Sequence, residues 1–288
     1  MKNNRTKYYI LFVISAAMIF SLVPMDINFS NNPKIGVVTI DEPIMSSREV
    51  ISELNKFNED DDIQGIIVRL NTPGGVVAPS QEIYEKVKSI SESNSKPIIA
   101  SMGSIATSGG YYIALGADTI VANKGTLTGS IGVIMSYPIF NDLLETYGVD
   151  YKTIKSGAYK DSGSAFRNPT IEDSLYFQDV VNDMYKQFIE VLKYERYLND
   201  DFISDVAKGK VYTGSQAKKL DLIDILGTFE DSVNLLLLLT ENLDKIPEII
   251  DGKEEESNLL LNIFNQTNKI IPFNKMLLFP LPEFKLYY

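Results

Sequence analysis

Residues 97–122 decide the fold, and they read PIIASMGSIATSGGYYIALGADTIVA. The run Pro97–Met102 is largely apolar and continuous, as in a buried strand. Gly109–Leu115 then predicts a helix, and the β-branched run Thr119–Ala122 predicts a second strand. A strand, a helix and a strand in succession form a βαβ unit with parallel strands. This segment therefore predicts an α/β fold.

The same alternation of strands and helices extends on both sides of this segment. Further strands are predicted by apolar and β-branched runs at Ile35–Ile40 and Gly65–Leu70, and we expect another strand at Tyr151–Ile154. Further helices are predicted by apolar residues at helical spacing at Ser47–Asn58, Ser80–Ile90, Ile171–Tyr197, Ser215–Leu220 and Phe229–Leu239. We therefore expect a largely parallel sheet with helices packed on it.

The composition excludes several kinds of chemistry. The 288 residues include no histidine and no cysteine. This excludes a Ser-His-Asp triad, a cysteine nucleophile, a Cys/His zinc site, an iron–sulfur cluster and a disulfide. Catalysis would rest on hydroxyls, amines, carboxylates and backbone donors, and we expect no cofactor. The formal charge of −11, from 27 basic and 38 acidic residues, disfavours a nucleic-acid partner, because phosphate binding needs clustered cations.

The N-terminus has the pattern of a membrane anchor. Residues 1–7 carry three cations, and residues 8–25 follow without a charge. These 18 residues would form about 27 Å of helix, close to the thickness of a bilayer's hydrocarbon core. The positive-inside rule then places residues 1–7 in the cytoplasm and the main domain outside it. A cleaved signal peptide is the alternative, and it places the main domain on the same side.

The main domain is expected between a short linker and a distinct tail. Residues 26–34 form the linker, and residues 251–288 form a tail that begins with an acidic run and ends in FPLPEFKLYY. The prolines of this tail disfavour a continuous helix and a second membrane span. We interpret the tail as an extended arm or a disordered tail rather than as part of the core. Our hypothesis is that it lies along a substrate groove or packs on a neighbouring subunit.

Two glycine clusters follow predicted strands, where α/β folds place their sites. Residues 71–75, NTPGG, follow Gly65–Leu70. An ordinary Pro-Gly turn explains them as well, and the spacing of a phosphate-binding loop is absent. The second cluster is ATSGGYY at residues 106–112, in which Ser108 lies at the expected start of a helix. Ser108 can be a nucleophile favoured by the helix dipole, or simply the helix N-cap.

A serine nucleophile needs a base, and in a chain without histidine a lysine held in its neutral form can serve. Lys160 lies among small residues in the loop KSGAYKDSG, just after Tyr151–Ile154. Its position is equally that of a surface lysine beside Asp161, and a neighbouring carboxylate favours the protonated form of a lysine. From the residues alone both roles stay open for Ser108 and for Lys160.

Four motifs carry a resemblance to a known family. They are SMGSIATSGGYYIALGADTIVAN from residue 101, TLTGSIGVIM from residue 126, IKSGAYKD from residue 154 and KVYTGSQAKKLDLID from residue 210. In order and spacing they resemble the signal peptide peptidase A (SppA) family of membrane-anchored Ser-Lys peptidases, over about residues 35–239. The resemblance implies a ClpP/crotonase fold of repeated ββα and βαβ units, preceded by one transmembrane helix. Residues 35–250 would then be the peptidase domain.

The resemblance also implies roles for single residues. Ser108 matches the family's nucleophile, and Lys160, 52 residues later, matches its general base. Ser130 matches the serine that hydrogen-bonds and orients the lysine. The backbone N–H of Gly75 matches the family's donor to the oxyanion hole, and we expect the amide of Gly109 as a second donor.

By this resemblance the chain is an endopeptidase that degrades remnant signal peptides after signal peptidase has released them. Its catalytic domain would lie on the extracytoplasmic side of the cell membrane, with residues 8–25 in the lipid and apolar peptides as substrates. Family members are homo-oligomers whose sites combine subunits. One departure is Lys210, where many family members carry arginine. Two alternatives stay open: a crotonase-like acyl-CoA enzyme, which would need catalytic carboxylates and a cationic CoA site, and a catalytically silent membrane scaffold.

Overall fold

The structure is a computed structural model, and it describes residues 32–93, 95–252 and 285–287. The predicted cytoplasmic segment 1–7, the anchor 8–25 and most of the predicted linker and tail lie outside the described residues. Of the helices that the structure describes, none combines the length and the apolar character needed to cross a membrane.

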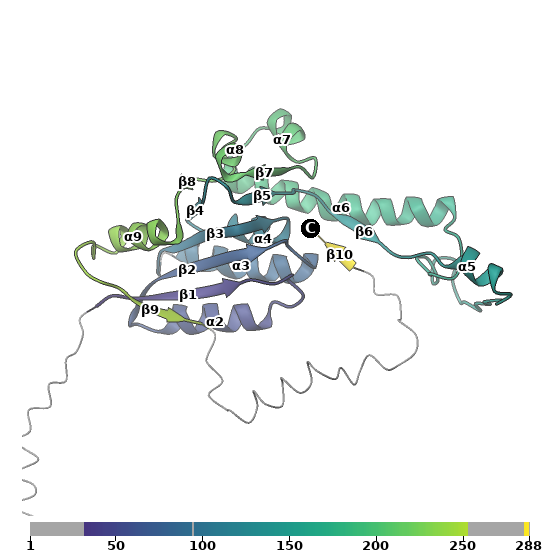
Figure 1. The fold of residues 1–288 in the computed structure, drawn as a ribbon, viewed down its shortest axis with the longest axis horizontal. Helices are drawn as coiled ribbons and strands as arrows, with labels where there is room; N and C mark the ends of the chain where they lie inside the picture. Colours follow the sequence, from purple (N-terminus) through teal and green to yellow (C-terminus); the bar gives the residue numbers. More distant parts are fainter. Residues whose placement is uncertain (1–31, 94, 253–284, 288) are drawn as a thin grey trace, which may run out of the picture. The chain divides into compact units, whose positions relative to one another are not determined.

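An eight-stranded sheet lies at the centre of the described fold (Figure 1). Six strands follow the order β7-β5-β3-β2-β1-β9, while β4 pairs with β3 and β8 pairs with β4. All these pairs are parallel except β5 with β7, so the largely parallel sheet is confirmed. The strands are β1 (Lys34–Ile40), β2 (Ile63–Thr72), β3 (Ile98–Thr107), β4 (Thr119–Ala122), β5 (Leu127–Gly129), β7 (Val211–Thr213), β8 (Ile225–Leu226) and β9 (Glu248–Asp251).

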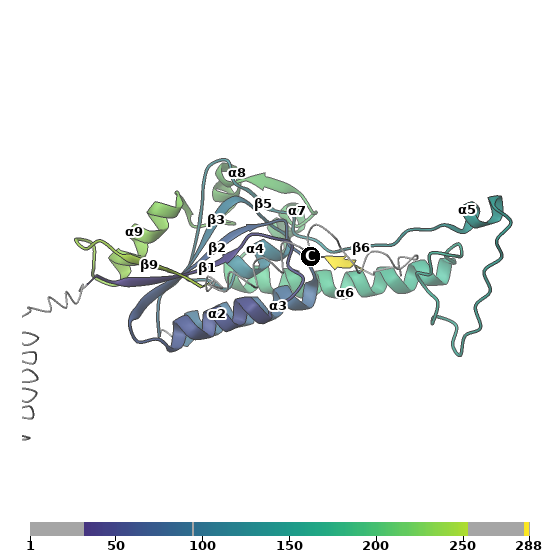
Figure 2. The same cartoon turned by 60° about the horizontal axis from the view of Figure 1, so that its bottom comes forward.

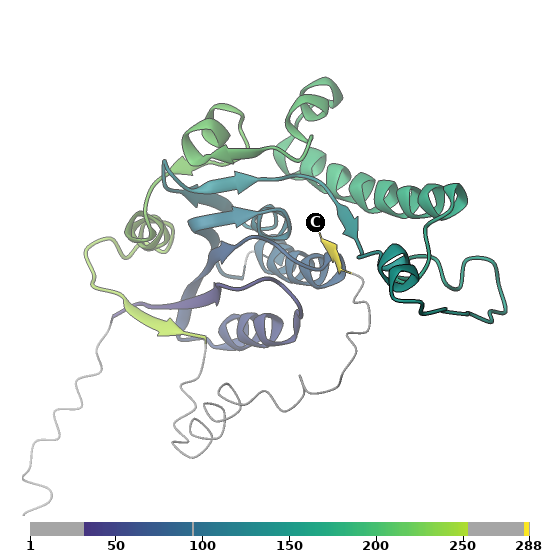
Figure 3. The ribbon, with the colours of Figure 1, turned by 45° about the vertical axis from the view of Figure 1, so that its right-hand side comes forward.

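The sheet is buried on both faces because its strands are apolar at consecutive positions. In β2, Ile66 and Val68 belong to one core cluster, while Ile67 between them belongs to the other. Side chains of a strand alternate between the faces, so each face needs its own cover. The first face is covered by α2 (Arg48–Glu59), α3 (Val77–Ser93), α4 (Gly109–Ala114), α6 (Ile171–Arg196), α7 (Asp200–Val206) and α8 (Gly214–Lys219). The second is covered by α9 (Phe229–Leu239), seen on the opposite side of the sheet in Figure 3.

The segment between β5 and the middle of α6 extends beyond the sheet (Figures 1 and 2). It contains β6 (Ile134–Ser136), α5 (Asn141–Thr146), an irregular stretch up to residue 170 and the first turns of α6. A capping box begins α6, in which Thr170 and Asp173 satisfy each other's backbone N–H groups. Near the end of the chain, β10 (Lys285–Tyr287) pairs antiparallel with β6.

The βαβ unit predicted for residues 97–122 is confirmed. Helix α4 follows β3 at Gly109, and β4 has the predicted bounds. Strand β3 runs on to Thr107, because its last residues pair with the three-residue strand β5. The predicted strand Tyr151–Ile154 is wrong. These four residues are exposed and pair with no strand of the described structure, and a strand is stable only where its backbone groups find a neighbour.

Candidate functional site

Ser108 lies in a sharp turn between β3 and α4. Its φ of 54° and ψ of −117° are a strained conformation for a residue with a side chain. Two backbone hydrogen bonds hold it there, since Ser108 N–H donates to Gly129 O at 2.8 Å and Tyr112 N–H donates to Ser108 O at 2.9 Å. The side chain is 4% exposed, forms no cap on α4, and its Oγ has no hydrogen-bond partner among the described residues. Ser108 therefore occupies the N-cap position of α4, as one interpretation expected, but its side chain does not cap the helix.

The two glycine clusters pack against each other beside Ser108. Gly74 has a φ of 99°, and a Cβ there would lie 2.7 Å from Gly109 N and 2.9 Å from Ser108 Cβ. A Cβ on Gly109 would lie 3.2 Å from Gly75 N, which places the amides of Gly75 and Gly109 close together. In the described part of the chain neither of these two N–H groups has an acceptor. Two free donors beside a free hydroxyl can bind the oxygen of a carbonyl group placed there.

A cavity of about 700 Å³ opens at Ser108, and Ser130 also lines it. Ser130 follows Gly129, the residue whose carbonyl accepts the Ser108 N–H, so the two serine turns are joined. Ser130 has a φ of 52°, and its N–H donates to Lys210 O at 2.7 Å. Lys210 thus contributes through its backbone, which an arginine would supply equally. Most of the wall is apolar, including Pro43, Pro73, Ile131, Val133, Val181 and Tyr185.

Lys160 does not line this cavity. It lies in an exposed turn before α6, and its own N–H donates to Gly157 O at 3.2 Å. Lys208 does line the cavity, with its Nζ 3.0 Å from Asp205 Oδ1. The structure therefore brings Ser108, Ser130 and the glycine amides together within one chain, but not Lys160. Sequence reasoning did not single out Lys208, because no motif or spacing distinguishes it from other surface lysines.

Two protein-family models match the chain. One describes peptidase family S49 and matches residues 91–241, and the other describes Clp protease and matches residues 34–123. The chain belongs to peptidase family S49.

Several relatives of this S49 peptidase carry the names of proteases. A candidate protease of Synechocystis is 41% identical over 204 residues, which cover 70% of this chain and 73% of the relative. A candidate signal peptide peptidase SppA of Enterococcus faecium is 37% identical over 186 residues, 65% of this chain and 54% of that protein. The chloroplastic serine protease SPPA of Arabidopsis thaliana is 34% identical over 182 residues, 63% of this chain and 27% of that protein. The resemblance to the SppA family is confirmed, and it supports a serine-type protease over an acyl-CoA enzyme.

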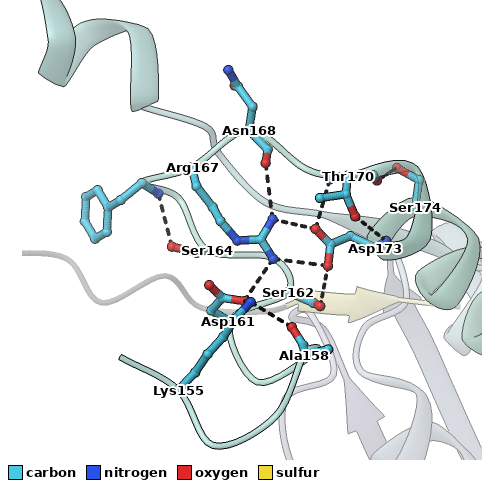
Figure 4. Close-up of polar contacts among 11 residues, drawn as sticks. Lys155, Ala158, Asp161, Ser162, Ser164, Arg167, Asn168, Thr170, Asp173 and Ser174 are labelled. Carbon is cyan, nitrogen blue, oxygen red and sulfur yellow. Dashed lines mark hydrogen bonds and ion pairs between the residues drawn. The ribbon is translucent and has the colours of Figure 1, made fainter. Parts of the chain in front are cut away.

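A second cluster of polar side chains in this S49 peptidase surrounds Arg167 (Figure 4). Arg167 lies close to Lys160 in the sequence. Arg167 donates to Asp161 at 3.0 Å and to both carboxylate oxygens of Asp173 at 2.5 and 3.1 Å. Lys155 Nζ lies 2.5 Å from Asp161 Oδ1. Hydrogen bonds from Arg167 and Lys155 hold the pKa of Asp161 at about 2, and those from Arg167 hold the pKa of Asp173 well below its ordinary range. We call these four residues the Arg167 network.

Proposed function

We propose that this S49 peptidase is a Ser-Lys endopeptidase in which Ser108 is the nucleophile. The observation that carries the proposal is the Ser108 hydroxyl, which is buried and lies beside the free amides of Gly75 and Gly109. Buried hydroxyls are normally hydrogen-bonded, so this exception in a strained turn supports a functional role. A peptide carbonyl in the cavity would give the two amides the acceptor that they lack.

The chemistry follows from these groups. Ser108 Oγ attacks the peptide carbonyl carbon, and its proton passes to the neutral amine of Lys160. The oxyanion accepts hydrogen bonds from Gly75 and Gly109, and losing one such donor typically slows the reaction about 100- to 1000-fold. The C–N bond then breaks, and Lys160 returns the proton to the leaving amine. A water molecule activated by Lys160 hydrolyses the acyl-enzyme and frees Ser108.

In this proposal Lys160 comes from a neighbouring copy of the chain. Within one chain it is absent from the Ser108 cavity, and the segment that carries it exposes apolar side chains. Ile154 is 94% exposed, and Tyr147 and Leu175 are largely exposed as well. Large apolar side chains exposed on a segment that extends beyond the sheet are typical of protein–protein contacts. Contact with a second copy would remove water from the Lys160 amine, and burial favours the neutral form of a lysine. Ser130 would then orient the amine.

The proposed substrates are apolar peptides, such as signal peptides after their release. The apolar wall of the cavity supports this class, because each apolar side chain buried there gains about 1.5–3 kcal/mol. The edge of β6 supports an extended substrate, since β10 pairs with β6 and Ile134 of β6 lines the cavity. Residues 8–25 would hold the site at the outer face of the cell membrane, where such peptides are released.

The first test uses the full-length chain in detergent with a fluorogenic apolar peptide. We expect Ser108→Ala and Lys160→Ala to abolish cleavage, and Ser130→Ala to lower kcat at least tenfold. The rate should rise with pH as the base loses its proton. Lys208→Ala is the matched control, because Lys208 lines the Ser108 cavity, and we expect it to retain activity. Activity that survives Ser108→Ala or Lys160→Ala would contradict the dyad, and loss of activity in Lys208→Ala alone would assign the base to Lys208.

The second test asks whether the dyad spans two copies. The inactive variants Ser108→Ala and Lys160→Ala are mixed in equal amounts, dissociated and reassembled. If each site combines two copies, about a quarter of the sites regain both groups, because half of the chains carry Ser108 and half of their neighbours carry Lys160. A mixture that stays inactive would place both groups in one chain.

A further inference from the structure

The Arg167 network joins the segment that carries Lys160 to the first turn of α6 (Figure 4). Arg167 bonds Asp161 on one side and Asp173, buried in the first turn of α6, on the other. A planar guanidinium can hold two carboxylates at once, whereas an ammonium acts as a point charge. Arg167 is therefore suited to fix two segments relative to each other.

Further bonds hold the segment on both sides of Lys160. Before it, Lys155 Nζ donates to Ala158 O at 2.8 Å. After it, Ser162 Oγ donates to Asp173 Oδ1 at 2.5 Å. In the part of the chain that the structure describes, the Lys160 ammonium has no bonded partner. Lys160 is thus a cation of this segment whose charge is not paired within the described part of the chain.

The carboxylate nearest to Lys160 in the sequence is already paired with cations. Asp161 is 11% exposed at its side chain and accepts bonds from Arg167 and Lys155. A free carboxylate beside a lysine favours the protonated lysine, which cannot act as a base. The two cations and two carboxylates of the network sum to a charge of zero, so the network adds no net negative charge. The other titratable groups on the two segments include Asp150, Tyr151, Lys152, Tyr159, Glu172, Tyr176 and Asp179.

We propose that Arg167 is a positioning residue for Lys160, because it fixes the Lys160 segment on α6 and withholds the Asp161 carboxylate from the Lys160 amine. The inference rests on the proposed function, in which Lys160 is the base. It predicts that Arg167 and Asp161 act on the pH dependence of the reaction in opposite directions.

The test measures kcat and KM against pH for the full-length chain and its variants on the apolar peptide. We expect Arg167→Gln to raise the midpoint of the rising limb by about one pH unit, which lowers the rate below the midpoint about tenfold with little change in KM. Asp161→Asn should lower the midpoint, because it leaves the two cations of the network in excess. The double variant Arg167→Gln/Asp161→Asn should return the midpoint to near its original value. Arg167→Lys keeps the positive charge but cannot hold both carboxylates at once. We therefore expect kcat to fall while the midpoint of the pH profile stays the same.

The outcomes separate this inference from a structural role and from the proposed function. A merely structural role would lower the rate in Arg167→Gln and Asp161→Asn with the midpoint unmoved, and this result would overturn the inference. If Arg167→Gln does not fold, Asp161→Asn decides, and an unmoved or raised midpoint overturns the inference. Lys193→Gln is the control, since it breaks the exposed pair with Asp200 later in the chain and should change nothing. Cleavage that survives Lys160→Ala contradicts the proposed base itself, whereas loss in Lys160→Ala with an unmoved Arg167→Gln midpoint overturns this inference alone.

Discussion

The contact between the two glycine turns leads to a quantitative prediction for Gly109→Ala. A Cβ on residue 109 would lie 2.4 Å from Ser80 Oγ, 3.3 Å from Ser80 Cβ and 3.2 Å from Gly75 N. Ser80 is fully buried on α3, and its Oγ donates to Val76 O at 2.9 Å, so it has little room to yield. Overpacking of this kind costs about 1–3 kcal/mol. We therefore expect Gly109→Ala to lower the stability by that amount and to shift the start of α4.

The shift of α4 would also lower the rate of the reaction. The residue 109 amide lies at the start of α4, directly after Ser108. A shift of α4 would therefore move both the residue 109 amide and the Ser108 side chain away from Gly75. Losing one oxyanion donor costs about 100- to 1000-fold in kcat, and we expect a fall of this size in Gly109→Ala. KM should change less, because the apolar wall of the cavity is built by other segments.

A second substitution separates the steric cause from other effects. Ser80→Ala in the Gly109→Ala background removes the nearest obstacle and leaves contacts at 3.2 and 3.3 Å. Thermal unfolding should then recover most of the lost stability, while kcat recovers only in part because the contact with Gly75 N remains. Ser80→Ala alone is the control. Unchanged kcat and melting temperature in Gly109→Ala would refute the packing of the two turns, and an equal loss in the single and double variants would rule out Ser80 as the obstacle.

Three further predictions concern the other parts of the site. Gly75→Ala places a Cβ against the backbone oxygen of Ile44, so the residue 75 amide should move and kcat should fall at least about 100-fold. Full activity in a folded variant would rule out this amide as a donor. The pKa of Asp161 is lowered to about 2 in the folded state, so its pairing stabilises the fold above about pH 4 and is lost as the pH falls through 2. Asp161→Asn should therefore flatten the fall of melting temperature between pH 5 and 2, and an equally steep fall would contradict the ion pairs. Deleting residues 285–288 removes β10 from the edge of β6, so KM for extended peptides should decrease, and an unchanged KM would count against a substrate groove along β6.

The long elements could be predicted from the sequence because burial imposes a pattern on them. Helix α9 has the bounds that its apolar spacing predicts, and α6 differs from the prediction only at its last residue. The strands β5, β6 and β7 have three residues each, and a run of three residues fits a strand, a turn or a helix equally well. Their positions are set by pairing partners far away in the sequence, as when β5 pairs with the end of β3.

The serines of the site could be located from the sequence, whereas the surroundings of the proposed lysine base could not. Ser108 and Ser130 lie in turns beside glycines, so neighbouring residues in the chain signal their unusual backbone. Lys160 and Lys208 are both exposed residues of irregular segments. Which of them meets the cavity depends on packing between distant segments or between chains. No local sequence pattern indicates that packing.

The site lies where it does because β3 changes its neighbour part-way along its length. Residues Ile99–Met102 pair with β4, and Ile105–Thr107 pair with β5. Thr126 supports the change, since its Oγ1 donates to Gly103 O at 2.6 Å between the two paired stretches. Ligand sites of α/β sheets lie at the carboxyl ends of strands where neighbouring connections separate. Here β5 brings the Gly129 carbonyl to the Ser108 N–H and so holds the turn in its strained conformation. A three-residue strand that no sequence pattern indicates therefore converts an ordinary strand-to-helix turn into one that leaves a hydroxyl free.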